Sequence, residues 1–396
     1  MTGYRRILAY GVPFEAFTRD VWLICLSCII GAFGEGLYFW VFPLYVRLLH
    51  ADYVQLGLVF SALYGVSALV ILAGGFLSDR FDRKKLLIIG WMLWIFAPLI
   101  YSFAEDWTQL VPGTICWGAS NIGAPAINVY VVTSITDNKK VTSVLSFVWS
   151  TFSFSYIFAP TVGGYLTTIA GMKSVFYLST LLIAVSTGVM FFLPSQLPTK
   201  NKVEKHRFTL ASSEEKPLLR KLLIWSGFFV LVTFFTTLAR TFLPTFLNEQ
   251  LKLSTFYVGL FGSINFAGIT FIGIAMGRLG DRWKKSGTMT ICLLLFIISI
   301  VPMLLVRDPA TLMFLAFIYG GSAVTASLVT SLVGTIAPEA RRGLWLSIPQ
   351  SLGLVAGFAA PYLGGFLYTF SPYYVFIVSV SAIPFLLIFA LIGLKD

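Results

Sequence analysis

Twelve long apolar runs constrain the fold of this chain more than any other feature. Each has the length of roughly 20 or more residues that an α-helix needs to cross the core of a bilayer. A transmembrane β-barrel would instead show segments of about ten residues with alternating polarity. The sequence therefore predicts an all-α membrane protein with twelve transmembrane helices. They span residues 20–46, 53–77, 86–104, 107–134, 142–170, 174–194, 222–247, 255–277, 288–306, 311–336, 344–370 and 373–394.

The basic residues are distributed unevenly between the connections of these runs. If the N-terminus is cytoplasmic, the inner segments hold 23 of the 28 Lys and Arg, and the outer connections hold four. Such an excess is typical of cytoplasmic loops. We therefore expect a multi-pass protein of the cell membrane with both termini in the cytoplasm. A nucleic-acid-binding face would not alternate in this way, so the net charge of +11 does not indicate nucleic acid as a partner.

A polar stretch and an internal repeat divide the runs into two sets of six. Residues 195–221 are rich in Lys, Glu, Ser and Pro, and we interpret them as a cytoplasmic linker between bundles at 1–194 and 222–396. Four segments of each set match in order, at an offset of 201 or 202 residues. The pairs are 39–46 with 240–247, 57–61 with 259–263, 75–80 with 277–282, and 159–166 with 360–367. Two copies with an even number of helices share one orientation, as in parallel repeats.

The connection after the second run carries the motif GGFLSDRFDRKK at 74–85, which recurs as MGRLGDRWKK at 276–285. It resembles the cytoplasmic signature G-x-L-[SAG]-D-R-x-G-R-[RK] of the major facilitator superfamily, with Asp82 in place of the second glycine. The connections after the fourth and tenth runs fit the same family. The resemblance covers the whole chain and implies two pseudo-symmetric six-helix bundles, the major facilitator fold.

This motif predicts a conformational clasp between the bundles. A carboxylate is stabilised at a helix N-terminus, so we expect Asp79 against the start of the eleventh helix and Asp281 against the start of the fifth. The glycines would permit close approach, and the arginines would donate to loop acids and carbonyls. The alternative is a solvated basic loop. The clasp residues are Gly75, Asp79, Arg80, Arg83, Gly277, Asp281 and Arg282.

A proline followed by two glycines occurs in the fifth and the eleventh run. The residues are Pro160, Gly163 and Gly164, and Pro361, Gly364 and Gly365. The motif is similar to G-P-x-x-G-G of the drug-antiporter branch, which implies a role in antiport coupling; close packing of small residues is the alternative. Thr114 departs from that branch, which usually has a basic residue at this point of the fourth helix.

The resemblance places a central cavity mainly between helices 1, 4, 7 and 10, with parts of 2, 5, 8 and 11. Polar residues on these helices are the candidates to line it, although buried hydroxyls can instead bond within or between helices. Besides Glu35 and Arg240, the candidates are Tyr38, Asn121, Asn128, Thr236, Thr237, Asn265, Tyr319 and Gln350.

Glu35 and Arg240 are the only acid and base well inside the apolar runs. A charge at that depth costs about 2.5–3.5 kcal/mol and normally faces a cavity or a partner. The repeat places both on corresponding faces of the first and seventh helices. We predict that they face the cavity and form a direct or water-bridged pair in at least one state. The alternative has Arg240 reaching the outer surface and Glu35 bonded to helix backbone.

These features favour a secondary transporter that moves a small molecule by alternating access. Export coupled to protons or another cation is the leading hypothesis; uptake or facilitated diffusion of a sugar, organic acid or other nutrient is the alternative, and a membrane sensor is a third. No phosphate-binding loop, catalytic constellation or metal-ligand spacing occurs in the sequence. We therefore expect no enzyme activity, no cofactor and no metal, and a monomeric protein.

Overall fold

The computed structural model describes residues 15, 17–78, 80–135, 140–197, 216–283, 285–336 and 342–393. The regular elements in these residues are helices. The first half contains α2 (Arg19–Phe39), α3 (Phe42–Leu48), α4 (Tyr53–Ser78), α5 (Arg83–Phe103), α6 (Leu110–Ser120), α7 (Gly123–Ser134), α8 (Val141–Ala170) and α9 (Met172–Met190). The second half contains α10 (Lys216–Glu249), α11 (Thr255–Arg282), α12 (Lys285–Met303), α13 (Pro309–Gly320), α14 (Val324–Ile336), α15 (Arg342–Phe370) and α16 (Tyr374–Gly393).

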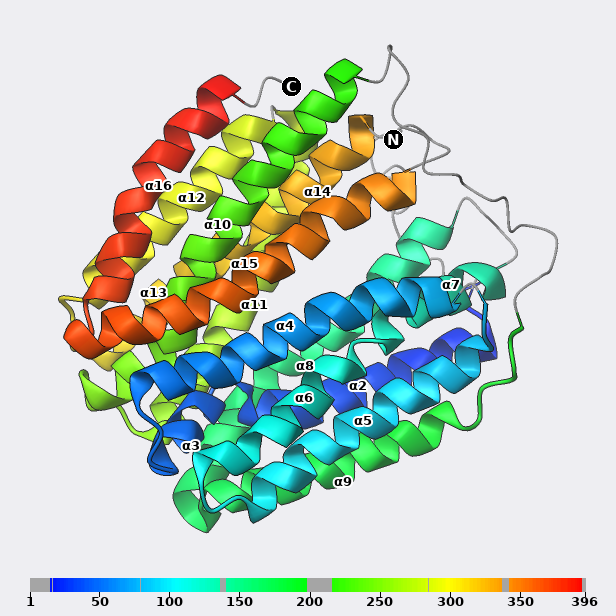
Figure 1. The fold of residues 1–396 in the computed structure, drawn as a ribbon, viewed down its shortest axis with the longest axis horizontal. Coiled ribbons are helices and arrows are strands. Elements are labelled where there is room, and N and C mark those ends of the chain that lie inside the picture. Colours follow the sequence, from blue (N-terminus) through cyan, green and yellow to red (C-terminus); the bar gives the residue numbers. More distant parts are fainter. Residues whose placement is uncertain are drawn as a thin grey trace, which may run out of the picture.

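The helices form two groups that converge at one end and diverge at the other (Figure 1). One group holds α2 to α9 and the other α10 to α16. Among the described residues, eleven helical stretches are long and apolar enough to cross a membrane. The predicted fifth span, α8, has 30 residues and is not among these eleven. The fold is therefore an all-helical membrane fold, and the count of twelve spans stays a prediction.

The fourth and tenth predicted helices are interrupted at matching points of the repeat. The first is split into α6 and α7 around Asn121, and the second into α13 and α14 by a short 3₁₀ turn, Gly321–Ala323. Pro125 lacks the N–H that would bond the Asn121 carbonyl, and the Ala124 N–H bonds that carbonyl instead, at 3.2 Å. Interrupted helices at corresponding positions of two repeats are typical of transporter binding sites.

The two groups of helices are in contact through α4 with α15 and through α8 with α11. The contacts lie at the converging end and follow the repeat. A Cβ atom at Gly57 would overlap the Pro361 carbonyl oxygen, and one at Gly259 would overlap the Pro160 carbonyl oxygen. The Ser61 hydroxyl donates to the Phe358 carbonyl at 2.6 Å across the same interface. These glycines therefore allow backbone-to-backbone contact that closes this end.

The two motifs with paired glycines belong to this closed interface. In each motif, the first glycine packs within its own bundle and the second packs against the opposite bundle. A Cβ at Gly163 would overlap α2 and one at Gly164 would overlap α11. Gly364 packs in the same way against α10, and Gly365 against α4. Close packing is thus what the motifs do in this conformation; a role in antiport coupling stays a prediction.

The diverging end carries the loops of the predicted clasp. Asp79 lies outside the described residues, and the side chain of Asp281 is likewise not described. A Cβ atom added at Gly75 or Gly277 would have no neighbouring atom within 4 Å, so neither glycine is in a close contact in this conformation. The guanidinium of Arg80 lies 3.9 Å from the ring centre of Phe76. Arg83 donates hydrogen bonds to Thr133 and Gln196 in the same half of the chain. Arg282 is exposed. The clasp therefore stays a prediction, for a conformation in which this end closes.

Asp82, the departure from the family signature, has a local role. Its carboxylate accepts hydrogen bonds from the Lys84 N–H at 3.0 Å, which caps α5, and from Ser195 and the Gln196 N–H after α9. Burial alone would raise the pKa of Asp82, but these hydrogen bonds outweigh it and hold the pKa below its ordinary value. Asp82 therefore connects the segment that follows α9 to the start of α5 through hydrogen bonds.

Candidate functional site

A central cavity of about 380 Å³ lies between the two bundles and contains Glu35. The residue is on α2, one turn before that helix ends at Phe39. Its carboxylate oxygen Oε1 accepts a hydrogen bond of 2.5 Å from the Tyr156 hydroxyl of α8. The carboxylate of Glu35 thus has a hydrogen-bond partner within its own bundle, and its side chain also lines the cavity.

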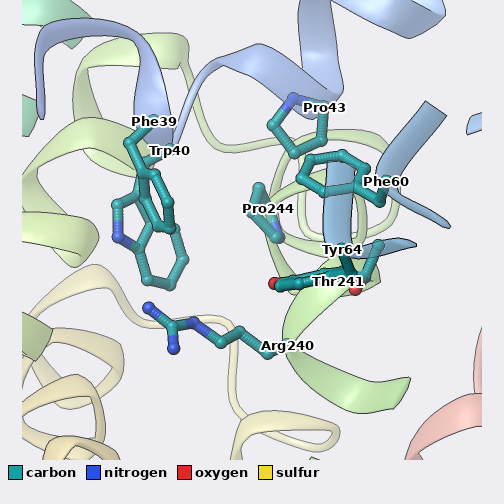
Figure 2. Close-up of a pocket in the computed structure, with 8 residues that line it drawn as sticks. All are labelled: Phe39, Trp40, Pro43, Phe60, Tyr64, Arg240, Thr241 and Pro244. Carbon is teal, nitrogen blue, oxygen red and sulfur yellow. The ribbon is translucent and has the colours of Figure 1, made fainter. Parts of the chain in front are cut away.

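Arg240 enters the same cavity from the opposite bundle, on α10. Its guanidinium lies 5.5 Å from the ring centre of Phe39 and has no hydrogen bond or ion pair within the described part of the chain. Figure 2 shows it at the lower end of a gap, below Phe39 and Trp40, with Pro43 and Pro244 to the right of these two side chains. This gap holds only about 30 Å³, so the passage beyond Arg240 is closed. Glu35 and Arg240 face one cavity without pairing in this conformation, and their pairing stays a prediction.

A recess within the second bundle is rich in hydroxyl groups. This recess of about 200 Å³ next to the central cavity is lined by the candidates Thr236, Thr237, Asn265 and Tyr319, together with Arg240. Asn265 donates to the Ala316 carbonyl at 3.3 Å, which joins α11 to α13. On the other wall, Asn121 lines the central cavity and donates to Ser67 at 3.2 Å. The structure therefore brings seven of the ten cavity candidates to the two recesses that meet at Arg240.

Three candidates lie elsewhere. Tyr38 is fully buried and packs on Tyr101 and Phe176 in the first bundle. With 3.6 residues per turn, position 39 lies about 40° from Glu35 around the helix and position 38 about 60° away on the other side. Phe39 therefore takes the place on the cavity wall that the sequence suggested for Tyr38. Asn128 is exposed and accepts from the Trp149 indole at 2.9 Å, and Gln350 is exposed on α15.

Sequence reasoning missed most of the aromatic wall. Four indoles line the central cavity: Trp91, Trp94, Trp117 and Trp149. The spacing of Trp91 and Trp94 on α5, three residues apart, and of Trp149, Phe152 and Tyr156 on α8 indicated one face for each set. That signal was hidden by the general abundance of aromatic residues, which make up 16% of the chain.

Thr114, the departure from the drug-antiporter pattern, is held within the first bundle. It is completely buried, donates to the Leu110 carbonyl at 2.9 Å and shares a hydrogen bond of 3.0 Å with Tyr101. The fourth helix thus presents a neutral side chain at this position, and Arg240 of α10 supplies the positive charge of the cavity.

An ion pair joins the two bundles at the closed end. Arg47 of α3 donates through Nε to Glu249, the last residue of α10, at 2.9 Å. The Tyr53 hydroxyl donates to the other oxygen of Glu249 at 2.8 Å, and the Arg47 guanidinium lies 4.1 Å from the Tyr53 ring centre. About a quarter of the Arg47 and Glu249 side chains is exposed. The sequence had assigned no role to these residues.

The comparison with known families agrees with this architecture. The Major Facilitator Superfamily profile matches residues 24–259 and 228–396, which together cover nearly the whole chain. The chain belongs to the major facilitator superfamily. It is thus a membrane transporter for a small molecule and not an enzyme.

Similar proteins have names that refer to drug resistance. "Multidrug resistance protein MdtG" of Proteus mirabilis is 24% identical over 363 residues, which cover 89% of this chain and 90% of that protein. "Multidrug resistance protein 2" of Bacillus subtilis is 26% identical over 208 residues, so the match spans about half of each protein. Among solved structures, a mutant of the nucleoside transporter NupG has a TM-score of 0.79 at 14% identity, covering 95% of this chain and all of that one. Human organic anion transporter MFSD10 has a TM-score of 0.66, also at 14% identity, covering 94% and 99%.

Proposed function

We propose that this protein exports amphipathic compounds in exchange for protons, with Glu35 as the proton-binding group. The observation that carries the proposal is the position of Glu35, a carboxylate on the wall of the central cavity that accepts a hydrogen bond from Tyr156. The names of the relatives, multidrug resistance proteins, support export as the direction. Localisation in the cell membrane, cytoplasmic termini and a monomeric state belong to the same proposal.

The exchange requires that a proton and the substrate compete for one site. An ionised Glu35 attracts a positively polarised group of the substrate, whereas a protonated Glu35 has lost that attraction. The Tyr156 hydrogen bond holds the carboxylate in place in both forms. Proton binding from the outer side therefore releases the substrate there, and proton loss on the inner side prepares the site for the next molecule.

Alternating access would result from rocking of the bundles about the contacts of α4 with α15 and of α8 with α11. The conformation described here is closed at the end that carries Arg47 and Glu249. With the predicted orientation this is the outer end, and the cavity faces the cytoplasm. In the opposite conformation the clasp residues, led by Asp79 and Asp281, would close the cytoplasmic end.

Transport by purified protein in proteoliposomes tests the proposal. Counterflow against a panel of amphipathic compounds identifies substrates without a gradient, and an imposed pH gradient then tests coupling. We expect Glu35→Gln to abolish accumulation driven by the pH gradient and to retain counterflow, because it keeps the cavity but loses the titrating group. Glu105→Gln, which changes an exposed acid at the closed end, is the matched control and should behave as wild type. Accumulation against a gradient by Glu35→Gln would refute the coupling role.

The same assay separates export from nutrient uptake or facilitated diffusion. An exporter that exchanges protons moves substrate away from the compartment of higher pH, which corresponds to the cytoplasm. A nutrient importer coupled to protons would accumulate substrate in that compartment instead. A facilitator would show counterflow with no response to the pH gradient in either direction.

A further inference from the structure

The two walls of the central cavity differ in chemical character. The wall of the first bundle presents four indoles, the Phe39 ring and one carboxylate, Glu35. The second bundle contributes Leu354 and one guanidinium, Arg240, to the central cavity, and Arg240 also lines the neighbouring recess, whose wall is rich in hydroxyl groups. The central cavity alone, about 380 Å³, is in the range of small-molecule sites. A substrate in this space is in contact with aromatic, acidic and basic groups at once.

The acid and the base are kept apart by aromatic rings. The Tyr156 hydroxyl binds Glu35, the Tyr156 ring lies 5.7 Å from the Phe39 ring, and the Phe39 ring lies 5.5 Å from the guanidinium of Arg240. Both charged side chains line the cavity, yet they do not approach within 4 Å. Each charge thus remains available to a ligand, on opposite bundles.

Charge complementarity then restricts the ligand. When Glu35 is ionised, the cavity carries one negative and one positive group, and its net charge is zero. A purely cationic ligand at Glu35 would leave Arg240 unmatched and be repelled by it, and a purely anionic ligand at Arg240 would leave Glu35 unmatched. Charges removed from water without a partner are costly, so a ligand with both charges matches the cavity best.

We propose that the substrates are amphoteric aromatic compounds, with a basic nitrogen and an acidic group at the two ends of an aromatic body. The nitrogen binds Glu35 among the indoles, whose faces attract cations. The acidic group binds the guanidinium of Arg240, whose paired N–H groups fit a carboxylate, phosphonate or sulfonate. This rests on the proposed function, because the carboxylate that binds the nitrogen is the one that exchanges a proton.

The proposal is tested with four forms of one compound that differ only in their charges. The probes are 4-(aminomethyl)benzoic acid, its amide, its N-acetyl form and its N-acetyl amide, which are amphoteric, cationic, anionic and neutral versions of one aromatic body. The same four forms of 4′-(aminomethyl)biphenyl-4-carboxylic acid provide a longer body. Binding to purified protein is measured by calorimetry at about pH 7, where an alkylamine and a carboxyl group are both charged. No pH gradient is present, so the outcome does not depend on proton-coupled transport.

We expect the amphoteric form of at least one length to bind about tenfold more tightly than either singly capped form, the gain expected for a charged hydrogen bond. In Glu35→Gln, the amphoteric and the N-acetyl forms should bind equally well. In Arg240→Gln, the amphoteric form and the amide should bind equally well. Glu105→Gln and Arg307→Gln, which change exposed charges, should retain the wild-type order.

Three results would overturn the proposal. The first is tightest binding of the amide, strengthened further in Arg240→Gln, which would define a cation site. The second is tightest binding of the N-acetyl form with no response to Glu35→Gln, which would define an anion site. The third is no binding of any of the eight probes by protein that shows counterflow of another compound. If the probes bind in the expected order but the wild-type protein shows no accumulation driven by a pH gradient, only the proton coupling is refuted.

Discussion

The ion pair between Arg47 and Glu249 should hold the closed end of this conformation together. Replacement of Glu249 by Gln removes the charge and weakens the hydrogen bonds from Arg47 Nε at 2.9 Å and from the Tyr53 hydroxyl at 2.8 Å. Hydrogen bonds to charged groups contribute about 1.5–3 kcal/mol, whereas exposed ion pairs contribute about 0.2–1 kcal/mol. Because about a quarter of each side chain is exposed, we expect an intermediate loss of about 1–2 kcal/mol. That loss shifts the equilibrium toward opening of this end by a factor of about 5–30.

Thiol labelling measures this shift directly. Thr241 is buried in the narrow gap of Figure 2, so a cysteine there reports opening of the closed end. In a background without the four native cysteines, Thr241→Cys is labelled from the outer side with a membrane-impermeant reagent. We expect Glu249→Gln to raise the labelling rate by about 5–30-fold, the population shift given by 1–2 kcal/mol. The charge exchange Arg47→Glu with Glu249→Arg should restore much of the wild-type rate.

The matched control is Glu105→Gln, which removes an exposed acid from another connection at the same end. It should leave the labelling of Thr241→Cys unchanged. The reasoning is refuted if Glu249→Gln labels at the wild-type rate, or if the control accelerates labelling as much as Glu249→Gln does. A rate that stays high after the charge exchange would show that packing rather than charge closes this end.

Three further predictions concern the interface and the loops. Gly259→Ala should destabilise this conformation by about 1–3 kcal/mol, seen as a lower Tm in detergent, because its Cβ overlaps the Pro160 carbonyl; Gly277→Ala, whose Cβ meets no atom within 4 Å, should not change the Tm. Asp82→Asn should lower the free energy of unfolding by about 0.5–2 kcal/mol at neutral pH. Because the pKa of Asp82 is lowered in the folded protein, the wild type loses this stability as the pH falls through that pKa. The difference in Tm between the variant and the wild type should therefore vanish at acidic pH. Asp79→Asn should leave the Tm unchanged and slow transport by weakening one state by about 0.3–2 kcal/mol; unchanged transport rates would argue against the clasp.

The sequence predicted the helical membrane fold because the length and apolarity of its runs leave few alternatives. It did not predict the interruption of the fourth helix at Asn121, although Pro125 carried the signal, because a proline can also bend a helix without ending it. The tenth helix is interrupted at Gly321–Ala323 with no proline nearby, next to Gly320, whose backbone packs closely against α11. Such contacts depend on tertiary structure and leave no local pattern.

The site was predicted in part for a similar reason. Glu35 and Arg240 stood out because charges are rare in apolar runs, whereas the indoles did not, because aromatic residues occur throughout the chain. Tyr38 and Phe39 lie on either side of Glu35 around α2, at similar angles from it, so the sequence alone could not decide which of them faces the cavity. In the structure Phe39 lines the cavity and Tyr38 is buried in the first bundle. Arg47 and Glu249 lie at the ends of two helices, 202 residues apart in the sequence, and only the three-dimensional arrangement brings them together.

Proton release on substrate binding tests the central claim, that a proton and the substrate compete for Glu35. A substrate identified by counterflow is added to purified protein in weakly buffered solution with a pH indicator. The account predicts that the wild type releases protons when the substrate binds, that Glu35→Gln binds the same substrate without release, and that Glu105→Gln releases protons as the wild type does. Substrate binding without proton release by the wild type, or equal release by Glu35→Gln, would contradict it.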